Sequence, residues 1–271
     1  MPAPLEEAAK VAPQHAWFQL YGARDRRISE DMIRRANDAG INGLVFTVDV
    51  PVGTKREREI RSRLFEPRMP LRNYVEALRH PAWVIDFLRH GRPTFANWSP
   101  YFDAGTSPSE LFQLVRTQFP VDNQTWRDFE TFRRLWPRPL VIKGILHADD
   151  AVQAADLGVD GVVISNHGGR QLDRAPTPLE VLPAIRAAVG DRVAVMLDGG
   201  VRRGSDIVIA WALGARFIWI GRATIYGVAA FGLPGARRAI SILREEIDLT
   251  LKQIGCTSLD QLGPQFLLRD N

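Results

Sequence analysis

The sequence predicts an α/β fold of the (β/α)8 barrel type, of which six strands are present. The first observation is a pattern written three times: a helical stretch, a glycine suited to a left-handed C-cap, a short link and an apolar run. These joints lie at 39–43, 157–161 and 213–216. Each of them is typical of the αβ joint in a βαβ unit.

The second observation is a strict order of strand and then helix along the chain. The six apolar runs read as strands buried on both faces, at 17–21, 44–49, 139–144, 162–169, 193–200 and 217–222. The helices expected between them lie at 29–39, 148–157, 177–188 and 205–213, and helices after residue 222, such as 236–254, would close the outer layer.

The third observation separates a barrel from its structural alternative, a doubly wound sheet. Polar side chains stand at the carboxyl ends of many strands at once, as in the active site of a barrel. They are Gln19, Thr47, Asp49, Lys143, Ser165, His167 and Asp198.

The stretch 65–126 interrupts the βα period and is far longer than an ordinary loop. It is rich in proline and aromatic residues. We expect a long loop inserted at the catalytic face, acting as a lid or a subunit contact. A peripheral membrane patch is the alternative, because apolar residues there accompany Arg79, Arg89 and Arg92.

Composition narrows the cellular setting and the partners. Cys256 is the single cysteine, and neither a signal peptide nor an 18-residue apolar run is visible, so a cytoplasmic protein with at most peripheral membrane contact is expected. The chain has 35 Lys and Arg against 31 Asp and Glu. The arginines mostly alternate with acids, which favours solvated helix faces and an anionic small ligand over nucleic acid.

The strongest chemical signal is His167, which follows a strand and precedes two glycines. A histidine at a strand end can act as a general base, and Arg170 adds a fork that can bind a carboxylate. Asp49 would be costly to bury alone, so we expect it to pair with His167. Arg56 taken alone is an ordinary loop charge.

Two loops predict a phosphate site. The segment 198–204 (DGGVRRG) opens a helix, and Gly221 with Arg222 follows the next strand, the place where barrels commonly bind phosphate. The phosphate could belong to a flavin or to a phosphorylated substrate. Lys143 ends an apolar strand, where a buried ammonium needs a partner for its charge, and we expect this partner to be a ligand. No metal site is predicted.

Several motifs together resemble the FMN-dependent 2-hydroxy-acid dehydrogenase and oxidase family, which includes glycolate oxidase, lactate oxidase and mandelate dehydrogenase. The most specific of them is SNHGGRQLD; the others are WFQLY, TVDVPVGTKRERE, IKG, LDGGVRRGSDI and IGRATIYG. HPAWVIDFLRHGRP and DLTLKQIGC are most similar to the mandelate dehydrogenase branch. The resemblance covers nearly the whole chain, 1–271, as one partial barrel.

The resemblance implies FMN-dependent oxidation of an (S)-2-hydroxy acid, mandelate-like or lactate-like, to the 2-oxo acid. His167 would be the base that takes a proton from the substrate, and Asp49 would support its imidazolium. Arg56 and Arg170 would bind the carboxylate, and Tyr21 would donate a hydrogen bond to the substrate.

The same resemblance implies how FMN is held. Lys143 would lie against the N1/O2 edge of the flavin and stabilise the negative charge of its reduced form. The remaining cofactor contacts fall into three groups: Gln19, Thr47 and Ser165 on the isoalloxazine; Asp198 on the ribityl chain; and Gly199, Gly200, Val201, Arg202, Gly221 and Arg222 around the phosphate. A quinone, a cytochrome or oxygen would accept the electrons, and family members are often homotetramers.

In the family, a helical region and barrel strands one and two precede the segment that 17–21 resembles. We therefore expect strands three to eight only, with 17–21 as an exposed apolar edge. The sequence is then a fragment, a truncated reading frame or a chain whose partner supplies the missing strands.

Two alternatives remain open from the residues. One is another phosphate-binding FMN barrel enzyme, such as a type 2 isopentenyl-diphosphate isomerase, which turnover of 2-hydroxy acids would distinguish. The other is a degenerate fragment that keeps the site residues but does not hold flavin, which the flavin content would distinguish.

Overall fold

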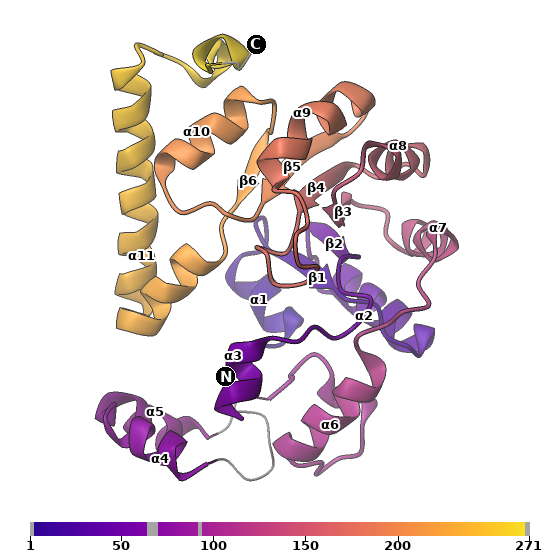
Figure 1. Cartoon of the computed structure of the whole chain (residues 1–271). Helices are drawn as coiled ribbons and strands as arrows, with labels where there is room; N and C mark the ends of the chain where they lie inside the picture. Colours follow the sequence, from indigo (N-terminus) through magenta and orange to yellow (C-terminus); the bar gives the residue numbers. More distant parts are fainter. Residues whose placement is uncertain (1–2, 64–69, 92–93, 269–271) are drawn as a thin grey trace. The chain divides into compact units, whose positions relative to one another are not determined.

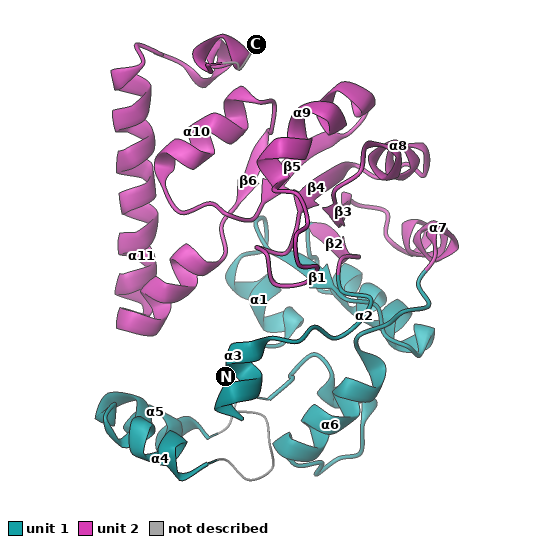
Figure 2. Ribbon diagram, in the orientation of Figure 1, with its two compact units in different colours: residues 1–42, 50–124 teal, residues 43–49, 125–271 magenta. Residues whose placement is uncertain are grey.

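The computed structural model describes residues 3–63, 70–91 and 94–268. The chain divides into two compact units, shown in different colours in Figure 2. Unit 1 comprises Met1–Asn42 and Val50–Gln124, and unit 2 comprises Gly43–Asp49 and Thr125–Asn271.

Unit 2 contains a parallel sheet whose strands follow one another in sequence order (Figure 1). Its strands are β2 (Gly43–Thr47), β3 (Leu140–Ile145), β4 (Gly161–Ser165), β5 (Ala194–Asp198) and β6 (Phe217–Trp219). Its helices are α7 (Trp126–Leu135), α8 (Ala148–Asp156), α9 (Pro178–Val189), α10 (Gly204–Ala212), α11 (Arg222–Gln253), η2 (Leu259–Gln261) and η3 (Pro264–Phe266). From β3 onward every strand is followed by a helix, as the sequence predicted.

The central strands of unit 2 are largely buried, whereas β6 has no buried residue. All five residues of β2 and of β4 are buried. A core cluster is formed by Val45, Val141, Val163 and Met196, one from each of four strands, and Trp219 packs against it. Continuous apolar runs rather than alternating ones are therefore the correct signal for these strands.

Strand ends account for most differences between prediction and structure. The predicted strand 193–200 ends at Asp198, because Gly199 and Gly200 take φ values of 104° and 78°, which are outside the β region. The predicted strand 217–222 ends at Trp219, and α11 begins at Arg222. The glycines predicted to line a ligand thus leave the sheet as loops.

Helices follow residue 222 as predicted: α11 is two helical stretches joined at a kink, and the predicted helix 236–254 corresponds to the second stretch. Phe231 and Gly232 have non-helical backbone angles, with φ of 60° at Gly232. The two stretches press together, because a Cβ built on Gly227 would lie 2.4 Å from the carbonyl oxygen of Gly235. Glycine at 227 is what permits this approach.

In its described residues, unit 1 contains one strand and several short helices. They are α1 (Leu5–Val11), β1 (Trp17–Leu20), α2 (Arg26–Asp38), α3 (Glu57–Ser62), α4 (Leu71–Leu78), α5 (Pro81–His90), η1 (Ser99–Tyr101) and α6 (Pro108–Gln118). Helix α2 begins before the predicted residue 29, because the side chain of Asp25 caps it by accepting a hydrogen bond from the N–H of Arg27, 3.0 Å away.

The described parts of the 65–126 segment are largely helical, whereas the sequence pattern predicts a long loop. They hold α4, α5, η1 and α6, while 65–69 and 92–93, with Arg92, lie outside the described residues. Helix α6 carries a capping box in which Ser107 and Glu110 satisfy each other's backbone N–H groups. Among the helices described in 3–63, 70–91 and 94–268, none has the length and apolar character needed to cross a bilayer.

Candidate active site

The carboxyl ends of the strands in unit 2 gather buried polar side chains. Thr47, Lys143 and Ser165 are 3%, 6% and 0% exposed, which is unusual for polar residues in a core. Thr47 stands in register with Lys143, and Ser165 with Asp198. Parallel pairing therefore brings together side chains that lie far apart in the sequence.

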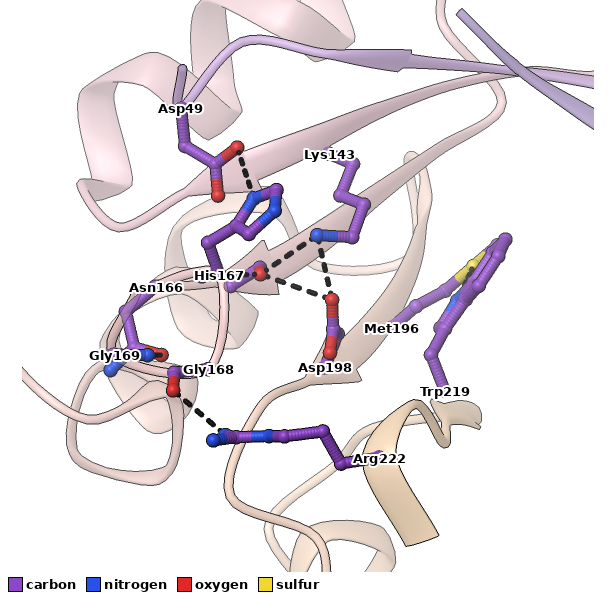
Figure 3. A network of polar contacts seen from close by, with 11 residues as sticks. Asp49, Lys143, Asn166, His167, Gly168, Gly169, Met196, Asp198, Trp219 and Arg222 are labelled. Atoms are coloured by element: carbon purple, nitrogen blue, oxygen red, sulfur yellow. Dashed lines mark hydrogen bonds and ion pairs between the residues drawn. The ribbon is translucent and has the colours of Figure 1, made fainter. Parts of the chain in front are cut away.

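Lys143 is held by two oxygens (Figure 3). Its Nζ lies 2.6 Å from Oδ2 of Asp198 and 3.0 Å from Oγ of Ser165. The sequence pointed to a ligand as the partner of this buried charge; the structure shows that Asp198 is its counter-charge. An ammonium has three donors, so two protein oxygens leave one donor for a bound group.

The Ser165 hydroxyl organises the centre of this cluster. Its Oγ accepts hydrogen bonds from Lys143 Nζ and from the backbone N–H of His167, both at 3.0 Å. It donates its own hydrogen to Oδ2 of Asp198 at 3.2 Å. A hydroxyl has one donor and two acceptor sites, so protein groups use all of its capacity. A contact from Ser165 to a cofactor would have to replace one of these bonds.

His167 pairs with Asp49, as predicted. Its Nδ1 lies 3.0 Å from Oδ1 of Asp49, and the two side chains are 19% and 11% exposed. If the ionised Asp49 accepts the Nδ1 hydrogen, Nε2 carries the lone pair and can accept a proton. The backbone of His167 has φ of 57°, a rare value outside glycine and one that recurs at functional sites.

Glycines in neighbouring loops allow these groups to approach. A Cβ on Gly144, which has φ of 109°, would lie 2.6 Å from Cβ of Asp49. A Cβ on Gly168 would lie 2.6 Å from Nη2 of Arg222, and this same nitrogen donates to the carbonyl of Gly168 at 2.8 Å. The loop after β4 is therefore in direct contact with the start of α11 (Figure 3).

The two predicted phosphate loops differ at their helix N-termini. At α10 the backbone N–H groups of Arg202 and Arg203 donate to Asp206, at 2.8 and 2.9 Å, and the N–H of Gly204 donates to Glu246. Carboxylates thus already satisfy the positive end of α10. At α11 the N-cap is Gly221, which gives no side-chain cap.

Open space lies in front of two loop glycines. A Cβ built on Gly200 or on Gly221 would meet no described atom within 4 Å. Gly200 follows the end of β5, and Gly221 precedes Arg222 at the start of α11. A phosphate could reach backbone here, whereas at the start of α10 it would meet two carboxylates.

Three predicted site residues belong to unit 1. Gln19 and Tyr21 line a cavity of about 470 Å³, and the Tyr21 ring centroid lies 4.9 Å from that of Phe119. Arg56 is the N-cap of α3, and its Nη1 lies 3.5 Å from Oε1 of Glu59. Arg170 belongs to unit 2, in the loop that follows β4.

Some residues at the site carried no usable sequence signal. Trp219 donates its Nε1 hydrogen to Sδ of Met196 at 3.4 Å, beside the Lys143 cluster (Figure 3). Glu246 and Asp206 read as ordinary charges on helices. Only the fold shows that their carboxylates satisfy the start of α10.

Comparison with known proteins agrees with these observations. The family model described as FMN-dependent dehydrogenase matches residues 2–269. An L-lactate dehydrogenase of Caulobacter sp. (strain K31) is 40% identical over 266 residues, which are 98% of this chain and 70% of the relative. An (S)-mandelate dehydrogenase of Pseudomonas putida is also 40% identical, over 97% of this chain and 66% of the relative.

Solved structures give the same result for the fold. A crystal structure described as the monotopic membrane protein (S)-mandelate dehydrogenase has a TM-score of 0.92 and 40% identity, covering 98% of this chain and 70% of that one. A mandelate oxidase with (S)-4-hydroxymandelic acid has a TM-score of 0.77 and 37% identity, over 95% and 66%. The prediction of an incomplete α/β barrel is confirmed. This chain belongs to the FMN-dependent dehydrogenase family, a family of oxidoreductases whose cofactor is FMN.

Proposed function

We propose that this chain carries the site for oxidation of an (S)-2-hydroxy acid, mandelate-like or lactate-like, to the 2-oxo acid. The observation that carries the proposal is the His167–Asp49 pair, 3.0 Å apart, in the unit that also holds the Lys143 cluster. FMN, when bound, accepts the two electrons that the substrate loses. One relative is named for lactate and another for mandelate at equal identity, so identity does not decide between these acids.

His167 is the proposed general base. Asp49 orients the ring and leaves Nε2 to take a proton from the substrate. As the imidazolium forms, the carboxylate of Asp49, 11% exposed and 3.0 Å from Nδ1, stabilises its charge. Oδ2 of Asp49 is buried and has no hydrogen-bond partner among the described residues, so one further donor could be accommodated there.

Two arginines and a tyrosine are proposed to bind the substrate. Arg170 follows His167 by three residues in the same loop, so a carboxylate bound by its guanidinium would stand near the base. Arg56 would supply a second guanidinium and Tyr21 a hydroxyl. The likeness of their motifs to those of the family supports these two roles.

The residues present fit FMN. Lys143 has a donor left for the flavin N1/O2 edge. Gln19, Thr47 and Ser165 are the further isoalloxazine contacts that the family resemblance implies. Asp198 would meet the ribityl chain. The open glycines and nearby cations would hold the phosphate: Gly199, Gly200, Val201, Arg202, Gly221 and Arg222. At α10, however, the phosphate would be bound by the loop before the helix, not by the N-terminus itself.

Peripheral membrane binding through α4 and α5 is the second part of the proposal. Leu71, Tyr74, Val75 and Leu78 recur at i, i+3, i+4 and i+7 and are 48 to 78% exposed. Within the described stretch 70–91, neither helix has a buried residue. Such a stripe with arginines beside it suits the surface of a bilayer. The similar mandelate dehydrogenase structure is that of a monotopic membrane protein, which supports peripheral membrane binding in general.

The remaining partners follow from the family. The substrate is a small 2-hydroxy acid, and a quinone, a cytochrome or oxygen reoxidises the cofactor. We propose a homo-oligomer, with the tetramer of the family as the expected state, in the cytoplasm or at the inner face of the plasma membrane. Because the chain spans 62 to 70% of the length of the first curated relatives, turnover by this chain is itself part of the proposal.

The experiment is an absorbance spectrum of the purified chain supplied with FMN, before and after anaerobic addition of (S)-mandelate and, separately, (S)-lactate. Loss of the flavin band with an (S)-acid and not with (R)-mandelate is the expected result. A chain that takes up FMN but is bleached by neither acid would refute the reaction. A chain that takes up no FMN would leave family membership intact and remove the claim of activity, in favour of the degenerate fragment.

A further inference from the structure

The start of α10 is held from a distance by Glu246, a residue in the second stretch of α11. Oε2 of Glu246 accepts the backbone N–H of Gly204 at 2.7 Å, and Oε1 accepts a hydrogen bond from Nη1 of Arg203 at 2.9 Å. The Gly204 N–H, and then the Arg203 guanidinium, lower the pKa of the Glu246 carboxyl below its usual range. The carboxylate is therefore ionised while it holds this end of the helix.

The backbones of α10 and α11 meet closely at this point. A Cβ built on Gly204 would lie 2.4 Å from the backbone nitrogen of Ile247 and 2.6 Å from Cβ of Glu246. Only a residue without a side chain fits there. The position of α10 against α11 is thus set by direct contact and by two hydrogen bonds to one carboxylate.

A second carboxylate completes the arrangement. Oδ2 of Asp206 accepts the N–H groups of Arg202 and Arg203. Three consecutive backbone N–H groups, at 202, 203 and 204, thus point at carboxylates. The orientation of these N–H groups constrains the backbone that precedes α10, which includes Val201 and Gly200.

Helix α11 links this loop to the other phosphate loop. It begins at Arg222, whose guanidinium bonds to the carbonyl of Gly168, and it carries Glu246 beyond the kink. The contact of Gly227 with Gly235 joins the two stretches tightly. The loop after β5 and the loop after β6 are therefore connected through α11, with Glu246 as the attachment to α10.

We propose that Glu246 is a positioning residue for the phosphate of FMN. It does not touch the cofactor but fixes the 199–203 loop relative to Gly221 and Arg222. This inference rests on the proposed function of these loops. It predicts that Glu246 matters for the phosphate group specifically, because the contacts assigned to the flavin ring come from other strand ends.

Riboflavin, which lacks the phosphate, separates positioning from general stability. We would measure the dissociation constants of FMN and of riboflavin by flavin fluorescence for the wild-type chain, Glu246→Gln and Glu246→Ala. Glu245→Gln is the matched control, since Glu245 is the preceding residue and pairs with Arg238 at 3.2 Å. Circular dichroism and the thermal midpoint report whether each variant is folded.

The expected result is a loss of about tenfold in FMN affinity for Glu246→Gln, with riboflavin affinity unchanged, and a larger loss for Glu246→Ala. The control keeps the wild-type preference for FMN over riboflavin. If Glu246→Ala does not fold, Glu246→Gln alone decides, because it keeps an acceptor for Gly204 and loses the pair with Arg203.

Two results would overturn the inference while leaving the phosphate loops in place. One is equal loss of FMN and riboflavin affinity, which would make Glu246 merely structural; the other is a Glu246→Gln variant indistinguishable from Glu245→Gln. A wild-type chain that binds riboflavin as tightly as FMN would instead refute the phosphate loops themselves. The proposed oxidation is tested apart from all of these, by bleaching with the (S)-acids.

Discussion

The strand-end cluster of unit 2 and the helices α4 and α5 of unit 1 break the ordinary rule of burial in opposite ways. In the first, Lys143 and Ser165 are 6% and 0% exposed, although polar groups are costly to bury. In the second, Leu78 and Leu88 are 71% and 76% exposed on helices that have no buried residue in the described stretch 70–91. Folding alone favours neither arrangement.

The two regions differ in how the unfavourable burial of polar groups, or exposure of apolar side chains, is compensated. In the cluster the compensation is internal, because Asp198 neutralises Lys143 and the Ser165 hydroxyl uses its full hydrogen-bonding capacity. The helices α4 and α5 keep apolar side chains exposed in the described stretch 70–91, and the proposed bilayer surface would cover them. Departures from local rules of this kind mark functional regions. Changing one region at a time tests whether the two work separately.

The largest effect is expected from loss of the proposed base. His167→Gln removes the proton acceptor and lowers kcat for (S)-mandelate by about 10² to 10⁴. FMN affinity and vesicle binding stay unchanged, because the proposed role of His167 is in the reaction step alone. Stopped-flow reduction of the flavin measures the rate, and His15→Gln serves as the control. Wild-type rates in His167→Gln would remove the assignment of the base.

Substitutions in α4 and α5 should have the opposite effect, weakening membrane binding without changing the reaction. Leu78→Ser combined with Leu88→Ser lowers the partition coefficient onto vesicles of phosphatidylcholine and phosphatidylglycerol by at least about tenfold, since each leucine contributes about 1.5–3 kcal/mol when buried. Flavin reduction by substrate is unaffected. Cosedimentation with the vesicles measures the binding.

A matched double variant controls for the general loss of exposed apolar surface. Ile240 and Leu268, both in unit 2, are 48% and 98% exposed. Ile240→Ser with Leu268→Ser is expected to leave vesicle binding at the wild-type level. If both double variants reduce it equally, α4 and α5 are not a specific membrane surface.

A smaller effect on catalysis is expected from Arg170, which belongs to unit 2 as the strand-end cluster does. Arg170→Lys lowers kcat/KM for the 2-hydroxy acid by about tenfold, because an ammonium does not reproduce the two parallel hydrogen bonds of a guanidinium to a carboxylate. Arg174→Lys, in the same loop, is the control and keeps wild-type kinetics. Equal steady-state parameters in the two variants would show that Arg170 does not bind the substrate carboxylate.

The smallest effect concerns Tyr101, a residue of the 65–126 segment whose hydroxyl bonds to two residues of α2. Tyr101 donates its hydroxyl hydrogen to Asp31 at 2.7 Å and accepts one from Arg35 at 3.1 Å. Burial, and then the Asp31 carboxylate, raise the pKa of Tyr101 to about 12, while the Arg35 guanidinium acts in the opposite direction. Tyr101→Phe therefore lowers the free energy of unfolding by about 1 kcal/mol at neutral pH.

The sign of the pH dependence follows from the raised pKa. A tyrosine that loses its proton near pH 10 when unfolded, and only near pH 12 when folded, stabilises the fold fully below pH 10. This contribution is lost between pH 10 and 12. Urea unfolding of wild type and Tyr101→Phe should show a difference that shrinks across this range; a constant difference would contradict it.

The sequence allowed the strands and the polar groups at their ends to be predicted for a physical reason. Buried parallel strands must be continuously apolar, so a polar residue at the end of such a run is conspicuous. Lys143, Ser165 and Asp198 were found in this way, and Asp49 was paired with His167 because a buried carboxylate needs a partner. Helices α4 and α5 were missed, because proline and clustered aromatics there resemble an irregular loop.

By itself, the sequence determined the βα order, the family and the identity of the groups at the strand ends, because these depend on local pattern and motif. Only the tertiary structure decided how those groups share hydrogen bonds. Parallel register places Asp198 beside Ser165 and within reach of Lys143, and the packing of α11 places the Glu246 carboxylate at the start of α10. Such contacts join residues from separate elements, and a hydrogen-bond partner chosen by packing leaves no trace in the pattern of either element.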